Sequence, residues 1–244
     1  MQIFYAPDIF GDSYFLDEKE SKHCIRVLRM KKGTEVRLID GKGSLYHGII
    51  SNPDPKRCSI DITGKKADFE KRDYSLHIAI SPLKNPERFE WFIEKSVEIG
   101  VDEITPIICR NTEKPGIKSE RVNNIIVSAM KQSLKAYKTV LNRICLFNEF
   151  INRDFTGCRM IAHCNDLFER NKIPEVYSKN ENAVILIGPE GDFSEEEIKS
   201  AVGKDFRSVQ LGQSRLRTET AGVAACHSVY FINQRNSDFN GSEN

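Results

Sequence analysis

The chain has 244 residues, 39% of them hydrophobic, which is enough for one large or two modest domains with a real core. No apolar run approaches the roughly 20 residues of a membrane span, and the N-terminus lacks the features of a signal peptide, so we expect a cytoplasmic protein with no membrane partner. Seven cysteines without a CxxC pair argue against a disulfide framework or a zinc finger.

The formal net charge of +1 hides an uneven distribution. Residues 1–72 carry 14 basic and 11 acidic side chains, a net of +3, and the remainder carries 22 and 24, a net of −2. The segments 22–42 and 110–143 are the most basic. Phosphate backbones favour such patches, but solvated basic faces are common too, so charge alone leaves nucleic-acid binding open.

The first 70 residues alternate between short strands and turns. A helix over about residues 18–28, capped by Asp17, carries Lys22, Arg26 and Arg29 on neighbouring turns. The turn at 40–43 predicts a hairpin. Strands are predicted at 3–5, 13–16, 35–39, 45–51 and 58–63. The pattern predicts a small β-barrel with one helix.

A polar linker is predicted at 64–73, and after it strands alternate with helices. The strands are predicted at 75–81, 104–109, 144–147 and 160–163, and the helices at 86–99, ended by Gly100, and 119–137. This alternation predicts an α/β domain with a mainly parallel sheet. Lys131, Lys135 and Lys138 would share one face of the second helix, either as a basic stripe for RNA or as a solvent face. The polar tail at 236–244 is expected to be frayed.

A short apolar run at 183–187 predicts a strand buried on both faces, which ends at once in the Gly-rich turn 188–191. Ser194 and Glu197 form a capping box, so a helix is predicted from there to about Val202. A strand, a loop and a helix in this order place a ligand at the carboxyl edge of a parallel sheet. The loop is neither GxGxxG nor a P-loop, and its acidic residues would repel a pyrophosphate.

A second unit of the same kind follows about twenty residues later. A strand is predicted at 208–211, a loop at 212–215, and a helix from Thr218 or Thr220 to about Asn233. Glycines at both strand ends suggest one shared pocket. The last helix is apolar on nearly all sides, more than one sheet face can cover, which predicts a homodimer.

IGPEGDFSEEE followed by LGQSRLRTETA resembles the paired signature of the SPOUT-superfamily methyltransferases that methylate N3 of a uridine in small-subunit (16S) ribosomal RNA. The resemblance extends upstream through HCIRVLRM, KNPERFEWFIEKSVEIGVDEITPI and the pair Gln132-Ser133, and covers most of the chain. The family's usual pattern has a second glycine where this chain has Asp192.

The resemblance implies a PUA-like RNA-binding β-barrel at 1–72 and a SPOUT methyltransferase domain at 73–244, with a deep trefoil knot around 183–234, an exception to the usual unknotted topology. It also implies a homodimer whose partner completes each active site. Two separate basic patches imply a long RNA footprint, so folded ribosomal RNA or the small subunit is expected to be a far better substrate than a short oligonucleotide. The resemblance implies action on the assembled or nearly assembled 30S subunit.

The cofactor implied by the resemblance is S-adenosylmethionine, bound in a bent form by the knot loops. The residues expected to hold it are Ile187, Gly188, Pro189, Glu190, Gly191, Leu211, Gly212, Leu216 and Thr220. Glycines allow the close backbone approach, and Glu190 is tolerated because the cofactor's sulfonium and amino groups are cationic. The expected RNA-binding residues are Arg26, Arg29, Lys131, Gln132 and Lys135.

Methylation of uracil N3 requires removal of the imide proton and stabilisation of the charge that spreads onto the carbonyl oxygens. Arg217 suits the second task, because its guanidinium is always charged and cannot act as a base. Glu219 or Glu190 would accept the proton, and the sequence does not choose between them. The alternative for Arg217 is a structural ion pair with one of these carboxylates.

Three other interpretations compete with this one. A dinucleotide-dependent enzyme would need a glycine motif that residues 81–85 do not offer. A non-catalytic RNA-binding protein would share the basic patches but needs no pair of Gly loops, and a SPOUT enzyme could act on another RNA nucleotide. Cys158, His163 and Cys164 lie close together, but adjacent strand residues point to opposite faces, so no metal is expected.

Overall fold

The computed structural model describes residues 2–234, so the predicted frayed tail at 236–244 lies outside the described residues. The chain divides into two compact units. Within the described residues, the first unit combines 2–71 with 127–138, and the second combines 72–126 with 139–234. None of the helices in this range has the length and apolarity needed to cross a bilayer.

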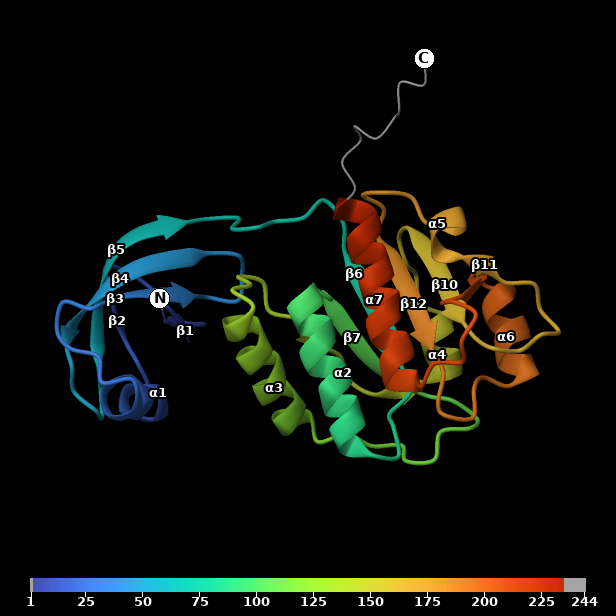
Figure 1. Cartoon of the computed structure of the whole chain (residues 1–244), viewed down its shortest axis with the longest axis horizontal. Coiled ribbons are helices and arrows are strands. Elements are labelled where there is room, and N and C mark those ends of the chain that lie inside the picture. Colours follow the sequence, from blue (N-terminus) through green and yellow to red (C-terminus); the bar gives the residue numbers. More distant parts are fainter. Residues whose placement is uncertain (1, 235–244) are drawn as a thin grey trace, which may run out of the picture. The chain divides into compact units, whose positions relative to one another are not determined.

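The first unit is built on a five-stranded sheet (Figure 1). Its strands, in spatial order, are β1 Ile3–Tyr5, β3 Glu35–Ile39, β4 Leu45–Asn52, β5 Ser59–Lys66 and β2 Ser13–Phe15. Only the β1–β3 pair is parallel, as expected for a chain of hairpins closed by its first strand. The predicted linker at 64–73 is wrong at its start, because residues 64–66 extend β5 along β4.

One helical segment follows β2, and it is not the single α-helix predicted for 18–28. The side chain of Asp17 caps α1, Glu18–Lys22, as expected. The chain then widens into a π-helix, η1, His23–Val27, and a backbone bond from Leu28 N to His23 O closes its end. Arg29 adopts a left-handed conformation with φ 53°, so it lies outside the helix.

The second unit contains an eight-stranded sheet whose described pairs are all parallel. Its main path runs β11 Asn171–Lys172, β13 Arg207–Gln210, β10 Cys158–Ala162, β12 Ala183–Ile187, β6 Leu76–Ile80, β7 Glu103–Ile108 and β8 Val140–Leu141, and β9 Cys145–Leu146 also pairs with β7. The mainly parallel α/β domain is confirmed. The knot around residues 183–234 stays a prediction.

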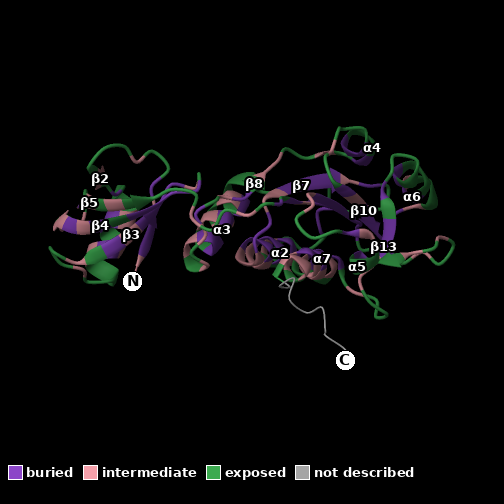
Figure 2. Cartoon of the chain, turned by 90° about the horizontal axis from the view of Figure 1, so that it is seen from above, coloured by how far each residue is buried: buried purple, intermediate pink, exposed green. Residues whose placement is uncertain are grey.

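Helices cover both faces of this sheet (Figure 2). On one face α2, Pro86–Ile99, packs along α7, Thr218–Gln234, and α7 also contacts β6 and β12. On the other face α4, Phe147–Ile151, and α6, Glu195–Val202, bury Phe150 and Ile198 against alternate residues of the central strands. A further short helix, α5, is Ile173–Val176. Asn85 caps α2 and left-handed Gly100 ends it, as predicted.

The second half of α3, Ser119–Gln132, belongs to the first unit. The helix was predicted to continue to Tyr137, but Leu134 turns left-handed at φ 58°. The following residues pair with the hairpin turn of the first unit, where Gly43 N donates to Ala136 O at 3.0 Å. Lys131, Lys135 and Lys138 therefore do not share one helix face, and the predicted basic stripe is wrong.

Candidate active site

The loop after β12 is the centre of the site. All five residues of β12 are buried, and Ser194 exchanges hydrogen bonds with Glu197 to start α6, so the predicted strand and capping box are confirmed. Because β12 lies centrally in the sheet, its loop emerges at the carboxyl edge, between the ends of β10 and β6. In an open α/β sheet this edge is where ligands bind.

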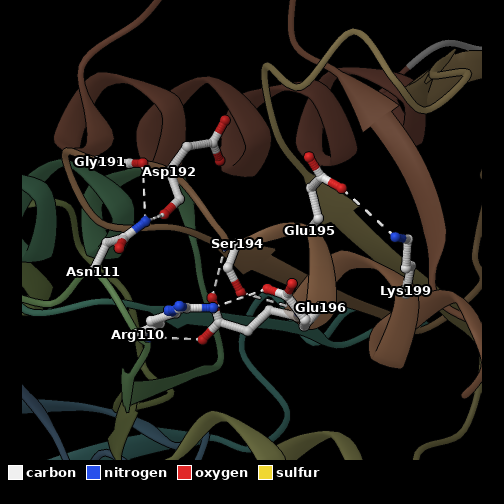
Figure 3. A network of polar contacts seen from close by, with 9 residues as sticks. Arg110, Asn111, Gly191, Asp192, Ser194, Glu195, Glu196 and Lys199 are labelled. Carbon is white, nitrogen blue, oxygen red and sulfur yellow. Dashed lines mark hydrogen bonds and ion pairs between the residues drawn. The ribbon is translucent and has the colours of Figure 1, made fainter.

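The segment after β7 holds this loop from the side (Figure 3). The amide of Asn111 donates to the carbonyls of Gly191 at 3.2 Å and Asp192 at 3.0 Å. Next to it, the Arg110 guanidinium pairs with Glu196 of α6 at 3.0 Å. The exposed ion pair contributes little to stability. The two hydrogen bonds from Asn111 hold backbone carbonyls that would be hydrated in a mobile loop.

Asp192 occupies the position where the resemblance expects a glycine, and its geometry explains the exchange. Its φ of 63° lies in the left-handed region, which favours glycine and which aspartate tolerates. Its carboxylate accepts hydrogen bonds from the backbone N–H of Phe193 at 2.8 Å and of Cys164 at 2.7 Å. The aspartate therefore keeps the turn and also ties it to the end of β10.

Two glycines of the loops matter for different reasons. A Cβ on Gly188 would lie 3.1 Å from the ring of Phe193, so a side chain there would require this ring to shift slightly. Gly212 has φ 140°, a conformation that other residues rarely adopt, although nothing lies within 4 Å of its added Cβ.

The loops enclose a pocket of about 350 Å³, a size that suits a small-molecule ligand. It is lined by the residues after β10, β12 and β13 and by the first turns of α2 and α7. Seven of the nine predicted cofactor residues line it, namely Ile187, Gly188, Pro189, Glu190, Leu211, Gly212 and Leu216. Gly191 lines an adjoining hollow instead, and Thr220 is exposed and does not line the pocket.

Both candidate catalytic residues line the same pocket. Arg217 immediately precedes α7 and is exposed, and within residues 2–234 it has no ion pair with Glu219 or Glu190. Glu219 is only 7% exposed, and its nearest cation is Arg88, with 3.7 Å between Nε and Oε1. The carboxylate of Glu190 accepts the backbone N–H of Lys84 at 3.0 Å, so it already serves to hold a neighbouring loop.

Arg88 and His163 are among the pocket residues that sequence reasoning missed. Arg88 lies in the first turn of α2, which follows β6, and only the sheet order shows that β6 lies beside β12. His163 directly follows β10, and its position at the end of a parallel strand was the signal available. It is buried, whereas Cys164 is exposed. Residues 2–234 contain no group of three metal-ligating side chains.

The five candidate RNA-binding residues all belong to the first unit. Arg26 and Arg29 are exposed, next to the end of η1. The ammonium of Lys131 is 2.7 Å from Glu20, so its charge is already paired. Gln132 is the last residue of α3 and is exposed, and Lys135 follows the helix.

Residues 70–230 match the family described as an RNA methyltransferase domain, and residues 16–63 match the RNA methyltransferase PUA domain. The chain is 32% identical to the ribosomal RNA small subunit methyltransferase E of Mesomycoplasma hyopneumoniae, over 87% of this chain and 92% of the relative.

Two crystal structures extend the comparison. The probable rRNA-methyltransferase of Porphyromonas gingivalis is 40% identical, with a TM-score of 0.90 over 96% of this chain and 98% of that one. A ribosomal RNA small subunit methyltransferase E from Neisseria gonorrhoeae, bound to S-adenosyl methionine, is 25% identical with a TM-score of 0.86, over 95% of this chain and 98% of that one.

Proposed function

Since the chain belongs to the ribosomal RNA small subunit methyltransferase E family, we propose that it transfers a methyl group from S-adenosylmethionine to N3 of a uridine in 16S ribosomal RNA. The observation that carries the proposal is the pocket formed by the loops after β12 and β13, with Arg217 and Glu219 on its wall. We assign RNA binding to residues 1–72 and methyl transfer to residues 73–244.

The pocket residues fit this cofactor. Gly188 and Gly212 expose backbone to the pocket, and Glu190 and Glu219 supply negative charge that a cationic ligand tolerates. The relative bound to S-adenosyl methionine shares the fold. When bound, the cofactor supplies an electrophilic methyl group. The loops after β12 and β13 would hold it through their backbone groups.

Arg217 and Glu219 have complementary tasks in this proposal. The imide N–H of uracil must lose its proton as nitrogen becomes the nucleophile, and we assign the buried Glu219 carboxylate as the group that accepts it. Negative charge then develops on the uracil carbonyl oxygens, where the Arg217 guanidinium, which has no ion pair with Glu219 or Glu190 among residues 2–234, can stabilise it. Arg88 lies near enough to Glu219 to hold its orientation.

RNA binding by the first unit predicts a specific salt dependence. Replacing Arg26→Ala together with Arg29→Asn removes two exposed cations, and asparagine suits the left-handed backbone of residue 29. Affinity for small-subunit RNA should fall. The negative slope of log affinity against log salt should become shallower by roughly 1.5, at about 0.7–0.9 per lost phosphate contact.

Binding titrations across a salt series measure this slope, and calorimetry with S-adenosylmethionine should show unchanged affinity. Lys199→Ala, which removes an exposed cation of the second unit, is the matched control. An unchanged slope in the double variant would remove η1 from RNA recognition.

We also propose a homodimer that covers the outer face of α2 and α7. The 17-residue α7 buries only six residues, and Phe231 of α7 and Trp91 of α2 are 57% and 43% exposed. Large apolar side chains on adjacent helices are typical of a protein interface. Trp91→Glu with Phe231→Glu should therefore give a monomer with reduced methylation.

Light scattering measures the mass of each variant. Val202→Glu places the same charge on α6, on the other face of the sheet, and should leave the dimer intact. A wild-type protein that stays an active monomer at all concentrations would contradict the proposal.

The function itself is tested with ribosomes from cells that lack this protein. Mass spectrometry of their 16S RNA should show one uridine without its N3 methyl group, and the purified protein with S-adenosylmethionine should restore it. Because the two units would give a long footprint, 30S subunits should be better substrates than short oligonucleotides. We expect the reaction in the cytoplasm, where ribosomes assemble. A methyl group restored to another atom or base would revise the substrate.

A further inference from the structure

His163 is a buried side chain on the wall of the pocket that the reaction above does not use. It follows β10 at the carboxyl edge of the sheet and is 5% exposed. Both ring nitrogens are buried, and neither has a hydrogen-bond partner among residues 2–234. Buried polar atoms without partners are rare in folded proteins, and each one calls for an explanation.

The rest of His163 is firmly held. Its backbone N–H donates to Val209 O at 3.4 Å, and its carbonyl accepts from the Arg170 guanidinium at 3.1 Å. The ring packs edge-on against Phe168, with 5.8 Å between centroids. These contacts hold the imidazole in one position on the pocket wall. Its two ring nitrogens remain without a partner among residues 2–234.

His77 of β6 shows what a largely buried histidine looks like when its role is structural. Its Nε2 lies 2.7 Å from the Thr105 hydroxyl, its Nδ1 lies 3.8 Å from Glu103, and it does not line the pocket. His77 therefore has protein partners for both ring nitrogens, whereas His163 has none among residues 2–234.

Burial lowers the pKa of His163, opposed by nearby Asp192 and assisted by Arg170, so the ring is neutral near pH 7. A neutral imidazole presents one N–H donor and one acceptor nitrogen. The charged groups beside it are already occupied, because Asp192 accepts two backbone N–H groups and Arg170 binds Asp166. This side of the pocket therefore suits an uncharged ligand group that both donates and accepts hydrogen bonds.

A pair of oppositely charged side chains, Arg88 and Glu219, lies in another part of the pocket. Arg88 follows β6 and Glu219 begins α7, whereas His163 follows β10, two strands away in the sheet order and hence about 10 Å across. In S-adenosylmethionine the ammonium, carboxylate and sulfonium carry the charges, and the adenosine carries neutral donors and acceptors. The charge pattern therefore matches the amino-acid part to the side with Arg88 and the nucleoside to the side with His163.

We propose that the His163 side chain hydrogen-bonds the nucleoside part of S-adenosylmethionine and so positions the cofactor. This inference rests on the proposed function and deepens it by assigning a binding group. It needs no change in the chemistry assigned to Arg217 and Glu219.

Calorimetry with two ligands tests the assignment. The ligands are S-adenosylmethionine and 5′-methylthioadenosine, which keeps the nucleoside and lacks the amino-acid part. His163→Phe keeps an aromatic ring beside Phe168 but removes both nitrogens, so it should weaken the binding of both ligands by about 10-fold or more, and by a similar factor. His77→Phe makes the same exchange at a partly buried site outside the pocket and should bind both ligands as wild type does.

Three other binding results would contradict the assignment of His163. Wild-type affinity in His163→Phe would make His163 a packing residue. A loss confined to S-adenosylmethionine would move the contact to the amino-acid part, and an equal loss in His77→Phe would show a general effect of the exchange. If the wild-type protein binds neither ligand, the proposed function fails first.

A second measurement uses the wild-type protein, so it does not depend on how well a variant folds. Nitrogen NMR of the histidine rings should show the His163 signals shifting when 5′-methylthioadenosine is added, while those of His77 stay in place. Unshifted His163 signals in the presence of bound ligand would overturn the proposal.

Discussion

Arg217→Ala is expected to lower the rate of methyl transfer by roughly 10²-fold or more, the scale for losing one well-placed transition-state donor. The guanidinium is exposed beside the pocket and pairs with neither carboxylate that could have held it structurally, since Arg88 lies next to Glu219, and Lys84 N–H donates to Glu190. Within the part of the chain that the structure describes, neither carboxylate keeps this guanidinium from contacting the substrate. Cofactor affinity should change little, because a guanidinium gives a cationic cofactor no attraction except through its carboxylate.

Single-turnover methylation of 30S subunits that lack the modification measures the rate, and calorimetry measures cofactor affinity. Arg217→Lys should recover only part of the rate, because an ammonium keeps the charge but loses the planar fork. Lys199→Ala, which removes an exposed side chain of α6, is the control for the loss of a cation. Methylation at the wild-type rate in Arg217→Ala would show that Arg217 has no part in the chemistry.

The second large effect is expected from Glu219→Gln, which should slow methylation by about 10² to 10⁴-fold if this carboxylate accepts the imide proton. Glutamine keeps the size and most contacts of the buried side chain, so the fold should be preserved. The competing base, Glu190, lines the same pocket but is engaged with the backbone of Lys84. Glu190→Gln should therefore lower the methylation rate less than Glu219→Gln does.

The two carboxylate variants are compared in the same single-turnover assay over a range of pH. Raising the pH ionises the uracil imide directly, so the defect of Glu219→Gln should shrink under alkaline conditions. Glu195→Gln, which removes an exposed carboxylate of α6, should methylate normally. If Glu190→Gln is the slower enzyme, or if the Glu219→Gln defect is independent of pH, the assignment of Glu219 as the base is wrong.

Local signals were sufficient for the elements that carry the site. The apolar run 183–187 forms β12, and the capping box of Ser194 and Glu197 starts α6, because both depend on residues adjacent in sequence. The same holds for α2, which runs from its Asn85 cap to Gly100. The glycines at both strand ends likewise predicted one pocket, because the carboxyl ends of parallel strands share an edge.

Local signals failed where distant segments compete for the same residues. Helical periodicity continues past Gln132, yet α3 ends there because residues 135–138 pair with the hairpin turn of the first unit. Such pairing satisfies backbone groups that a longer helix would also satisfy, so the tertiary contact decides. Lys135 and Lys138 lost their predicted helix face for this reason.

By itself, the sequence determined the two domain types, the strand-loop-helix units and the residues of the loops, since these follow from period, caps and glycines. Only the tertiary structure decided which strands are neighbours. The placement of β6 beside β12 brings Arg88 to Glu219, and the placement of β10 on the other side of β12 brings His163 to the pocket wall. Strand order depends on contacts between residues far apart in the chain, and no local pattern encodes them.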